Sequence, residues 1–80
     1  MTREESLNLQ VGDTVQLLRG KYRRVAREVI GIDFGQREGR TVPIYEMASM
    51  SGNGRNSRCS AITMQRTYEI VRSARLDSIQ

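Results

Sequence analysis

The chain has 80 residues, of which 38% are apolar, and 13 Lys and Arg against 9 Asp and Glu give a formal net charge of +4. A chain of this length forms one domain around a small core, which excludes multidomain enzymes. Cys59 is the only cysteine and there is no histidine, which excludes an internal disulfide, a Cys/His zinc site and a Cys–His nucleophile. The sequence therefore predicts a protein that is not an enzyme and has no catalytic residues, metal or cofactor.

Residues 1–8 are expected to form a flexible N-terminal arm. Thr2 and Glu5 have the spacing of a capping box, but one helical turn is unstable without packing. Leu7 and Leu9 alternate with polar residues and predict a short edge strand. The arm lacks the apolar core of a signal peptide, and no run approaches the roughly 18 apolar residues of a membrane-spanning helix. A cytoplasmic protein without membrane contact is expected.

The next stretch, residues 11–34, predicts a β-hairpin. Apolar residues alternate over residues 14–19 and again over 24–33, which is typical of strands. The connection at 20–23 contains Gly20, the expected turn residue. The apolar face changes near Arg27, which predicts a β-bulge or a sharp bend there.

Residues 35–39 are expected to form a loop before a third strand at 40–47. Pro43 has no N–H for a sheet ladder, so this strand is predicted to lie at an edge or to turn that position outward. Residues 48–60 are rich in Gly, Ser and Asn and predict a long flexible loop, which in a small domain is functional or disordered. An edge at Pro43 or the methionine Met50 in the loop leaves a homodimer open.

The C-terminal third predicts two more short strands. These are residues 61–64 and 68–72, separated by a tight 3₁₀ turn at 65–67. Residues 73–80 are expected to form a C-terminal tail with a frayed helical turn. Five short strands separated by turn signals indicate an all-β fold, a small five-stranded SH3-like barrel over residues 9–72 with the last strand beside the first. The four aromatic residues are expected to supply much of the core volume: Tyr22, Phe34, Tyr45 and Tyr68.

A cluster of cations surrounds the first predicted turn. It consists of Arg19, Lys21, Arg23, Arg24 and Arg27, with Tyr22 among them. Cations bind phosphates with release of counterions, and an exposed tyrosine stacks on unpaired bases. Arg55 and Arg58, in the long loop, are expected to close over the same ligand. The plain alternative is a solvated turn, with Tyr22 packed on the barrel.

Residues 12–32, GDTVQLLRGKYRRVAREVIGI, resemble the KOW motif of ribosomal proteins and transcription elongation factors. Gly12-Asp13, Val15, Gly20-Lys21 and Val29 fall on positions of that motif, whereas Arg24 and Arg27 stand where it has glycine. The resemblance covers about a quarter of the chain. It implies an SH3-like barrel that binds RNA or sits on RNA-associated machinery.

Two functions remain open from the sequence. The first is RNA or DNA binding through the basic turn and the long loop, probed by salt dependence. The second is a protein-binding adaptor or inhibitor, of the kind that phages and plasmids use as accessory factors, whose cations engage an acidic surface of a host protein. A protein interface would depend on a few residues, with arginine and tyrosine the expected ones.

Overall fold

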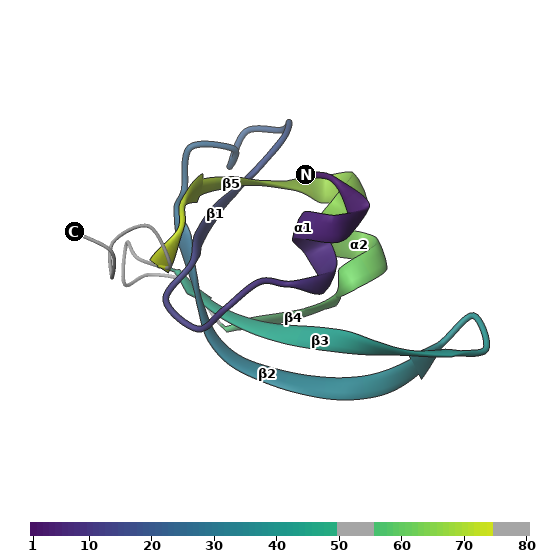
Figure 1. The fold of residues 1–80 in the computed structure, drawn as a ribbon. Coiled ribbons are helices and arrows are strands. Elements are labelled where there is room, and N and C mark those ends of the chain that lie inside the picture. The colour runs from purple at the N-terminus through teal and green to yellow at the C-terminus, as the bar shows by residue number, and fades with distance from the viewer. Residues whose placement is uncertain (50–55, 75–80) are drawn as a thin grey trace.

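The computed structural model describes residues 1–49 and 56–74. Figure 1 shows a curved sheet with two short helices at one end. The elements in chain order are α1 (Arg3–Leu7), β1 (Thr14–Leu17), β2 (Arg27–Arg37), β3 (Arg40–Ser49), β4 (Ser57–Ser60), α2 (Ala61–Thr67) and β5 (Tyr68–Arg72). The predicted β-rich fold is therefore confirmed.

The five strands form one antiparallel sheet in the order β4-β3-β2-β1-β5. The prediction that the last strand lies beside the first is confirmed, with Val15 opposite Ile70 and Leu17 opposite Tyr68. The two edge strands, β4 and β5, are joined through α2. Within the described residues no ladder joins β4 to β5, so the sheet is curved but not closed.

The N-terminal segment is a packed helix, α1, where the sequence predicts a loose arm and an edge strand. The capping box forms in both directions: the Glu5 N–H donates to Thr2 Oγ1 (3.1 Å) and the Thr2 N–H donates to Glu5 Oε1 (2.8 Å). Two hydrogen bonds with Thr2 lower the pKa of the Glu5 carboxyl. The bond from the Thr2 backbone has the larger effect, and the bond with its side chain has the smaller one. The helix persists at this length because it packs on α2 and the Tyr45 hydroxyl donates to the Ser6 carbonyl (2.6 Å).

The first hairpin is shorter than predicted and its loop is longer. β1 ends at Leu17, and β2 begins only at Arg27 and runs to Arg37. The two strands share only the pairs Thr14 with Glu28 and Val15 with Arg27. The register of β2 against β3 shifts between Val29 and Gly31. The bulge predicted near Arg27 is therefore present, and it lies at Ile30.

The hairpin between β2 and β3 turns within two residues, so the predicted five-residue loop is wrong. Glu38 (φ 53°) and Gly39 (φ 74°) both have positive φ, as a type I′ turn requires. Of the two predictions for Pro43, the edge strand is wrong, because β3 lies between β2 and β4. The alternative, a position turned outward, agrees with the structure: pairing with β4 begins only at Ile44, so no β4 residue lies beside Pro43 to require its N–H.

This turn yields a stability prediction, because Glu38 holds a conformation that asparagine and glycine tolerate better. We expect Glu38→Asn to raise the free energy of unfolding by about 0.5 kcal/mol. The matched change Gly39→Ala should lower it by about 1–2 kcal/mol, because alanine then has to adopt the left-handed region. Urea titrations should show shifted midpoints with an unchanged slope. Equal destabilisation by both variants would contradict the turn assignment.

Strands occupy the two ends of the long loop predicted at 48–60. β3 extends to Ser49, and β4 begins at Ser57, with Cys59 opposite Tyr45 and Ser57 opposite Met47. Residues 50–55, including Met50 and Arg55, lie outside the described residues, as do residues 75–80 of the predicted tail. The predicted strand at 61–64 and 3₁₀ turn at 65–67 are wrong. They form the helix α2, capped by Ser60, with Ala61 and Met64 buried.

The core lies between the concave side of the sheet and the two helices. Its largest fully buried side chains are Tyr45, Met47 and Met64. The same hydrophobic cluster also contains Leu9, Val15, Val29, Ala61 and Tyr68. Burial raises the pKa of the Tyr45 hydroxyl. Only two of the four aromatic residues contribute to the core, because Tyr22 is 57% exposed and Phe34 is 65% exposed.

Candidate nucleic-acid interface

Residues 18–26, which connect β1 to β2, form an ordered loop that we call the basic loop. Its start is fixed by the Leu18 N–H, which donates to the Thr67 carbonyl at the end of α2 (2.9 Å). Two turns follow, with N–H···O bonds from Arg23 to Gly20 (3.3 Å) and from Val25 to Tyr22 (3.0 Å). Gly20 has φ +101°, which confirms it as the turn residue. Three backbone hydrogen bonds therefore hold the start of the loop and its two turns.

The charged side chains of the basic loop all point into solvent. Its exposed residues include Arg19, Lys21, Tyr22, Arg23 and Arg24. Within residues 1–49 and 56–74, none of the four cations forms an ion pair with a carboxylate. The Lys21 ammonium lies 5.1 Å from the centre of the Tyr22 ring. The loop thus presents unneutralised positive charge beside an exposed aromatic ring, and this juxtaposition suits a phosphate next to a base.

Arg27, predicted with this cluster, lies apart from it. It is the first residue of β2 and is partly buried. Its Nη1 donates to Ser57 Oγ on β4 (3.1 Å), and its Nε is buried without a partner among the described residues. The Arg27 side chain therefore crosses the sheet towards β4 instead of extending with the loop.

Cys59 lies close to Arg27 and Tyr68 and is partly buried. Burial raises the pKa of its thiol, and the effect is opposed by a hydrogen bond from the Tyr68 hydroxyl and by the Arg27 charge. Burial likewise raises the pKa of Tyr68. A thiol with a raised pKa stays protonated at neutral pH and is a poor nucleophile. The geometry favours a structural role for Cys59.

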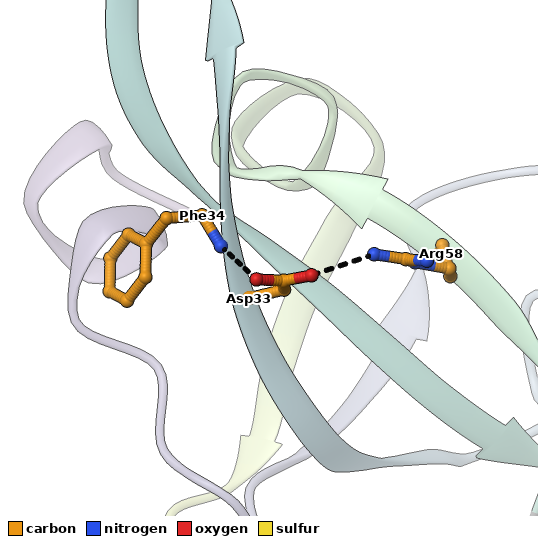
Figure 2. A network of polar contacts seen from close by, with 3 residues as sticks. All are labelled: Asp33, Phe34 and Arg58. Carbon is orange, nitrogen blue, oxygen red and sulfur yellow. Dashed lines mark hydrogen bonds and ion pairs between the residues drawn. The ribbon is translucent and has the colours of Figure 1, made fainter.

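Arg58, the other predicted loop cation, belongs to β4 and faces carboxylates. Its Nη2 lies 3.5 Å from Asp33 Oδ2, and both side chains are exposed (Figure 2). Across the ladder it stands opposite Glu46. Two strands, β3 and β2, separate β4 from β1 in the sheet. The structure thus brings residues 19–24 together, while Arg27 and Arg58 lie elsewhere and Arg55 lies outside the described residues.

A second basic surface was missed by the sequence analysis. A cavity of about 320 Å³ between the helices and the β2–β3 turn is lined by Arg3, Arg37, Arg40 and Arg66, and Glu38 is the one acidic residue among the described residues that line it. None of these arginines forms an ion pair within residues 1–49 and 56–74. In Figure 1 the β2–β3 turn and the basic loop lie at opposite ends of the molecule. The four arginines are scattered along the sequence, so no local pattern indicates that they share a surface.

Other kinds of site find no support in the described residues. They contain no group of three or more His, Cys, Asp or Glu side chains placed to hold a metal ion. None of their helices has the length and apolar character needed to cross a membrane. In comparisons with known proteins, no family model, curated protein or solved structure matches this chain.

Proposed function

We propose that this protein is a non-enzymatic nucleic-acid-binding domain that contacts RNA through the basic loop. The observation that carries the proposal is a set of four exposed cations beside Tyr22, which form no ion pair within residues 1–49 and 56–74 and lie on a loop with its own backbone hydrogen bonds. A loop held by such bonds loses little conformational entropy when it binds, so its cations can contact phosphates at low cost. Tyr22 adds a surface on which an unpaired base can stack.

The strand order supports an SH3-like barrel as the finer class of the fold. β1 pairs with β5, a long β2–β3 hairpin bends at a bulge, and a short helical segment precedes the last strand. Together with Gly12-Asp13 before β1 and Gly20-Lys21 in the basic loop, this order supports the resemblance to the KOW motif. That resemblance is in turn the reason for preferring RNA over DNA.

The proposal predicts electrostatic binding with a defined salt dependence. Four cations that neutralise phosphates of single-stranded RNA should give a plot of log K against log salt with a slope of about −2 to −3. Fluorescence anisotropy with labelled single-stranded RNAs of several sequences measures this slope, and affinities should vary little between sequences. Absence of binding at low salt would refute the proposal.

An acidic protein surface could engage the same cations, and the experiment separates the two partners. A protein partner would bind with fixed stoichiometry, and its affinity would depend on a few residues such as Tyr22 and Arg23. Nucleic acid should instead be recovered with the protein as nuclease-sensitive material. Recovery of one stoichiometric protein that survives nuclease treatment would favour an adaptor over the proposed function.

A further inference from the structure

Among the described residues, the far half of β2 (residues 31–37) has a neighbouring strand on one side only. β3 pairs with it throughout, whereas β1 reaches no further along β2 than Glu28. Val29 is the last residue covered, through the Asp13 carbonyl and the Gly12 N–H (both 2.8 Å). Among residues 1–49 and 56–74, none forms a ladder along this side of Gly31–Arg37. In Figure 1 this side of β2 is the outer rim of the sheet, away from both helices.

The hydrogen-bonding direction of each residue on this free edge follows from the turn. In a two-residue hairpin the flanking residues, here Arg37 and Arg40, exchange backbone hydrogen bonds, and the pattern then alternates. Gly35 and Asp33 therefore bond to β3. The N–H and C=O groups of Ile32, Phe34 and Gln36 point away from it.

Two observations agree with this alternation. The residue opposite Phe34 is Pro43, which has no N–H to donate. The Phe34 N–H donates to Asp33 Oδ1 (2.8 Å), a side chain from its own strand (Figure 2). A carboxylate that caps its neighbour's amide is what an edge amide without a strand partner requires.

Two apolar side chains on the free edge, Ile32 and Phe34, are exposed, beside the polar Asp33, Gln36 and Arg37. Ile32 is 39% exposed, and Phe34 is 65% exposed, the highest value among the large apolar side chains of the described residues. An exposed apolar edge with unpaired backbone groups is a template for another strand. Native proteins usually protect such edges, often with charged side chains, and among the described residues of this edge the charged side chains are Asp33 and Arg37.

We propose that a second copy of this chain pairs with this edge, β2 against β2, in an antiparallel ladder whose two-fold axis passes through Phe34. In that register the two Phe34 residues face each other, and Ile32 faces the partner's Gln36. Every outward-pointing backbone group then meets another outward-pointing group. The Phe34 N–H exchanges its bond with Asp33 for one with the partner's Phe34 carbonyl.

Side-chain pairing favours this register over its neighbours. Asp33 stands opposite the partner's Gly35, and its two diagonal neighbours are the partner's Arg37, which a long side chain can reach, and the partner's Asp33. If the two strands shifted so that the two-fold axis passed through Asp33, the two Asp33 carboxylates would face each other, which is unfavourable. If the axis instead passed through Gly35, Phe34 would face the partner's Gln36. The aromatic pair, which is worth about 0.5–1.5 kcal/mol, would then be lost.

The size of the edge sets the expected strength of the dimer. Stable interfaces use roughly 20–30 residues on each side, and this edge offers fewer. The dimer should therefore form reversibly as concentration rises from micromolar to millimolar. The inference does not rest on the proposed nucleic-acid function, because the basic loop lies far from this edge (Figure 1).

Sedimentation velocity on nuclease-treated protein over that concentration range tests the proposal. The wild type should pass from monomer to dimer. Phe34→Lys should remain a monomer, because two lysines would face each other on the axis, and its exposed position should leave the fold intact, as circular dichroism can check. The matched control is Val71→Lys, a 52% exposed position on the edge strand β5, which should still form dimers.

Hydrogen exchange provides a second measurement that needs no variant. The amides of Ile32 and Gln36 should exchange more slowly as concentration rises, while those of Asp33 and Gly35 are already protected in the monomer. In a Cys59→Ser background, Phe34→Cys should form a disulfide-linked dimer on mild oxidation. A monomer at millimolar concentration, a dimer unaffected by Phe34→Lys, or one abolished by Val71→Lys would each overturn the proposal.

Discussion

Replacing Arg23 and Arg24 together with glutamate is expected to weaken binding of single-stranded RNA by at least about 25-fold at 0.1 M salt. Each lost phosphate contact removes the release of about 0.7 counterion, which at this salt concentration is about 0.7 units of log K. Two lost contacts give the stated factor, and the two added carboxylates repel further phosphates. The salt slope should become shallower by about 1.4, measured by the same anisotropy titrations.

A matched control separates a local contact from a general effect of charge. Arg40→Glu with Arg66→Glu makes the same change in net charge, but on the arginine-lined cavity at the other end of the molecule. If the basic loop is the interface, this control should bind RNA with a nearly unchanged salt slope. Equal losses from both pairs would show that affinity follows net charge, and a larger loss from the control would move the interface to the cavity.

Replacing Tyr45 with alanine should abolish the folded state or nearly so. Its side chain is fully buried between the sheet and the helices. Truncating a buried aromatic residue costs about 3–5 kcal/mol. A chain of 80 residues has a free energy of unfolding of about 4–12 kcal/mol, of which this loss is a large share. Thermal unfolding followed by circular dichroism should show a greatly lowered midpoint or no transition.

Two other substitutions show which property of Tyr45 matters. Tyr45→Phe keeps the ring but leaves the Ser6 carbonyl without its 2.6 Å donor, which should cost about 1–3 kcal/mol and loosen α1 first. Phe34→Ala truncates an aromatic ring that is 65% exposed and should cost well under 1 kcal/mol. A loss from Phe34→Ala as large as that from Tyr45→Ala would contradict the assigned core.

The parts of the fold that the sequence predicted are those with local patterns. Alternation predicted strands over residues 14–19 and 68–72, and in the structure Val15 and Leu17 of β1 and Tyr68 and Ile70 of β5 face the core. The strand predicted at 61–64 failed because four residues cannot distinguish a period of two from one of 3.6. Ala61 and Met64, which are three residues apart, are the buried residues of α2. A flexible arm was predicted in place of the helix α1 because the stability of this helix comes from α2 and Tyr45, which are distant in the sequence.

The sequence predicted the part of the candidate site whose charged residues are neighbours in the chain. It did not predict the positions of charged residues that depend on the fold. Arg19 to Arg24 lie on one loop, so their clustering needed no tertiary information. Arg27 looks equivalent in the sequence, yet it begins a strand and its side chain turns towards Ser57. The four arginines around the cavity meet only because the hairpin between β2 and β3 approaches the helices.

The position of α2 between the two edge strands has a consequence for how the chain folds. β4, α2 and β5 are consecutive, yet β4 completes the sheet beside β3 and β5 completes it beside β1. The pairing of Val15 with Ile70 therefore joins the first strand to the last, and α1 also gains its partner helix only from this last part of the chain. Sheets that depend on such distant pairings fold in milliseconds to seconds rather than microseconds. During synthesis, a chain that ends before α2 leaves Tyr45 and Met47 without the elements that cover them.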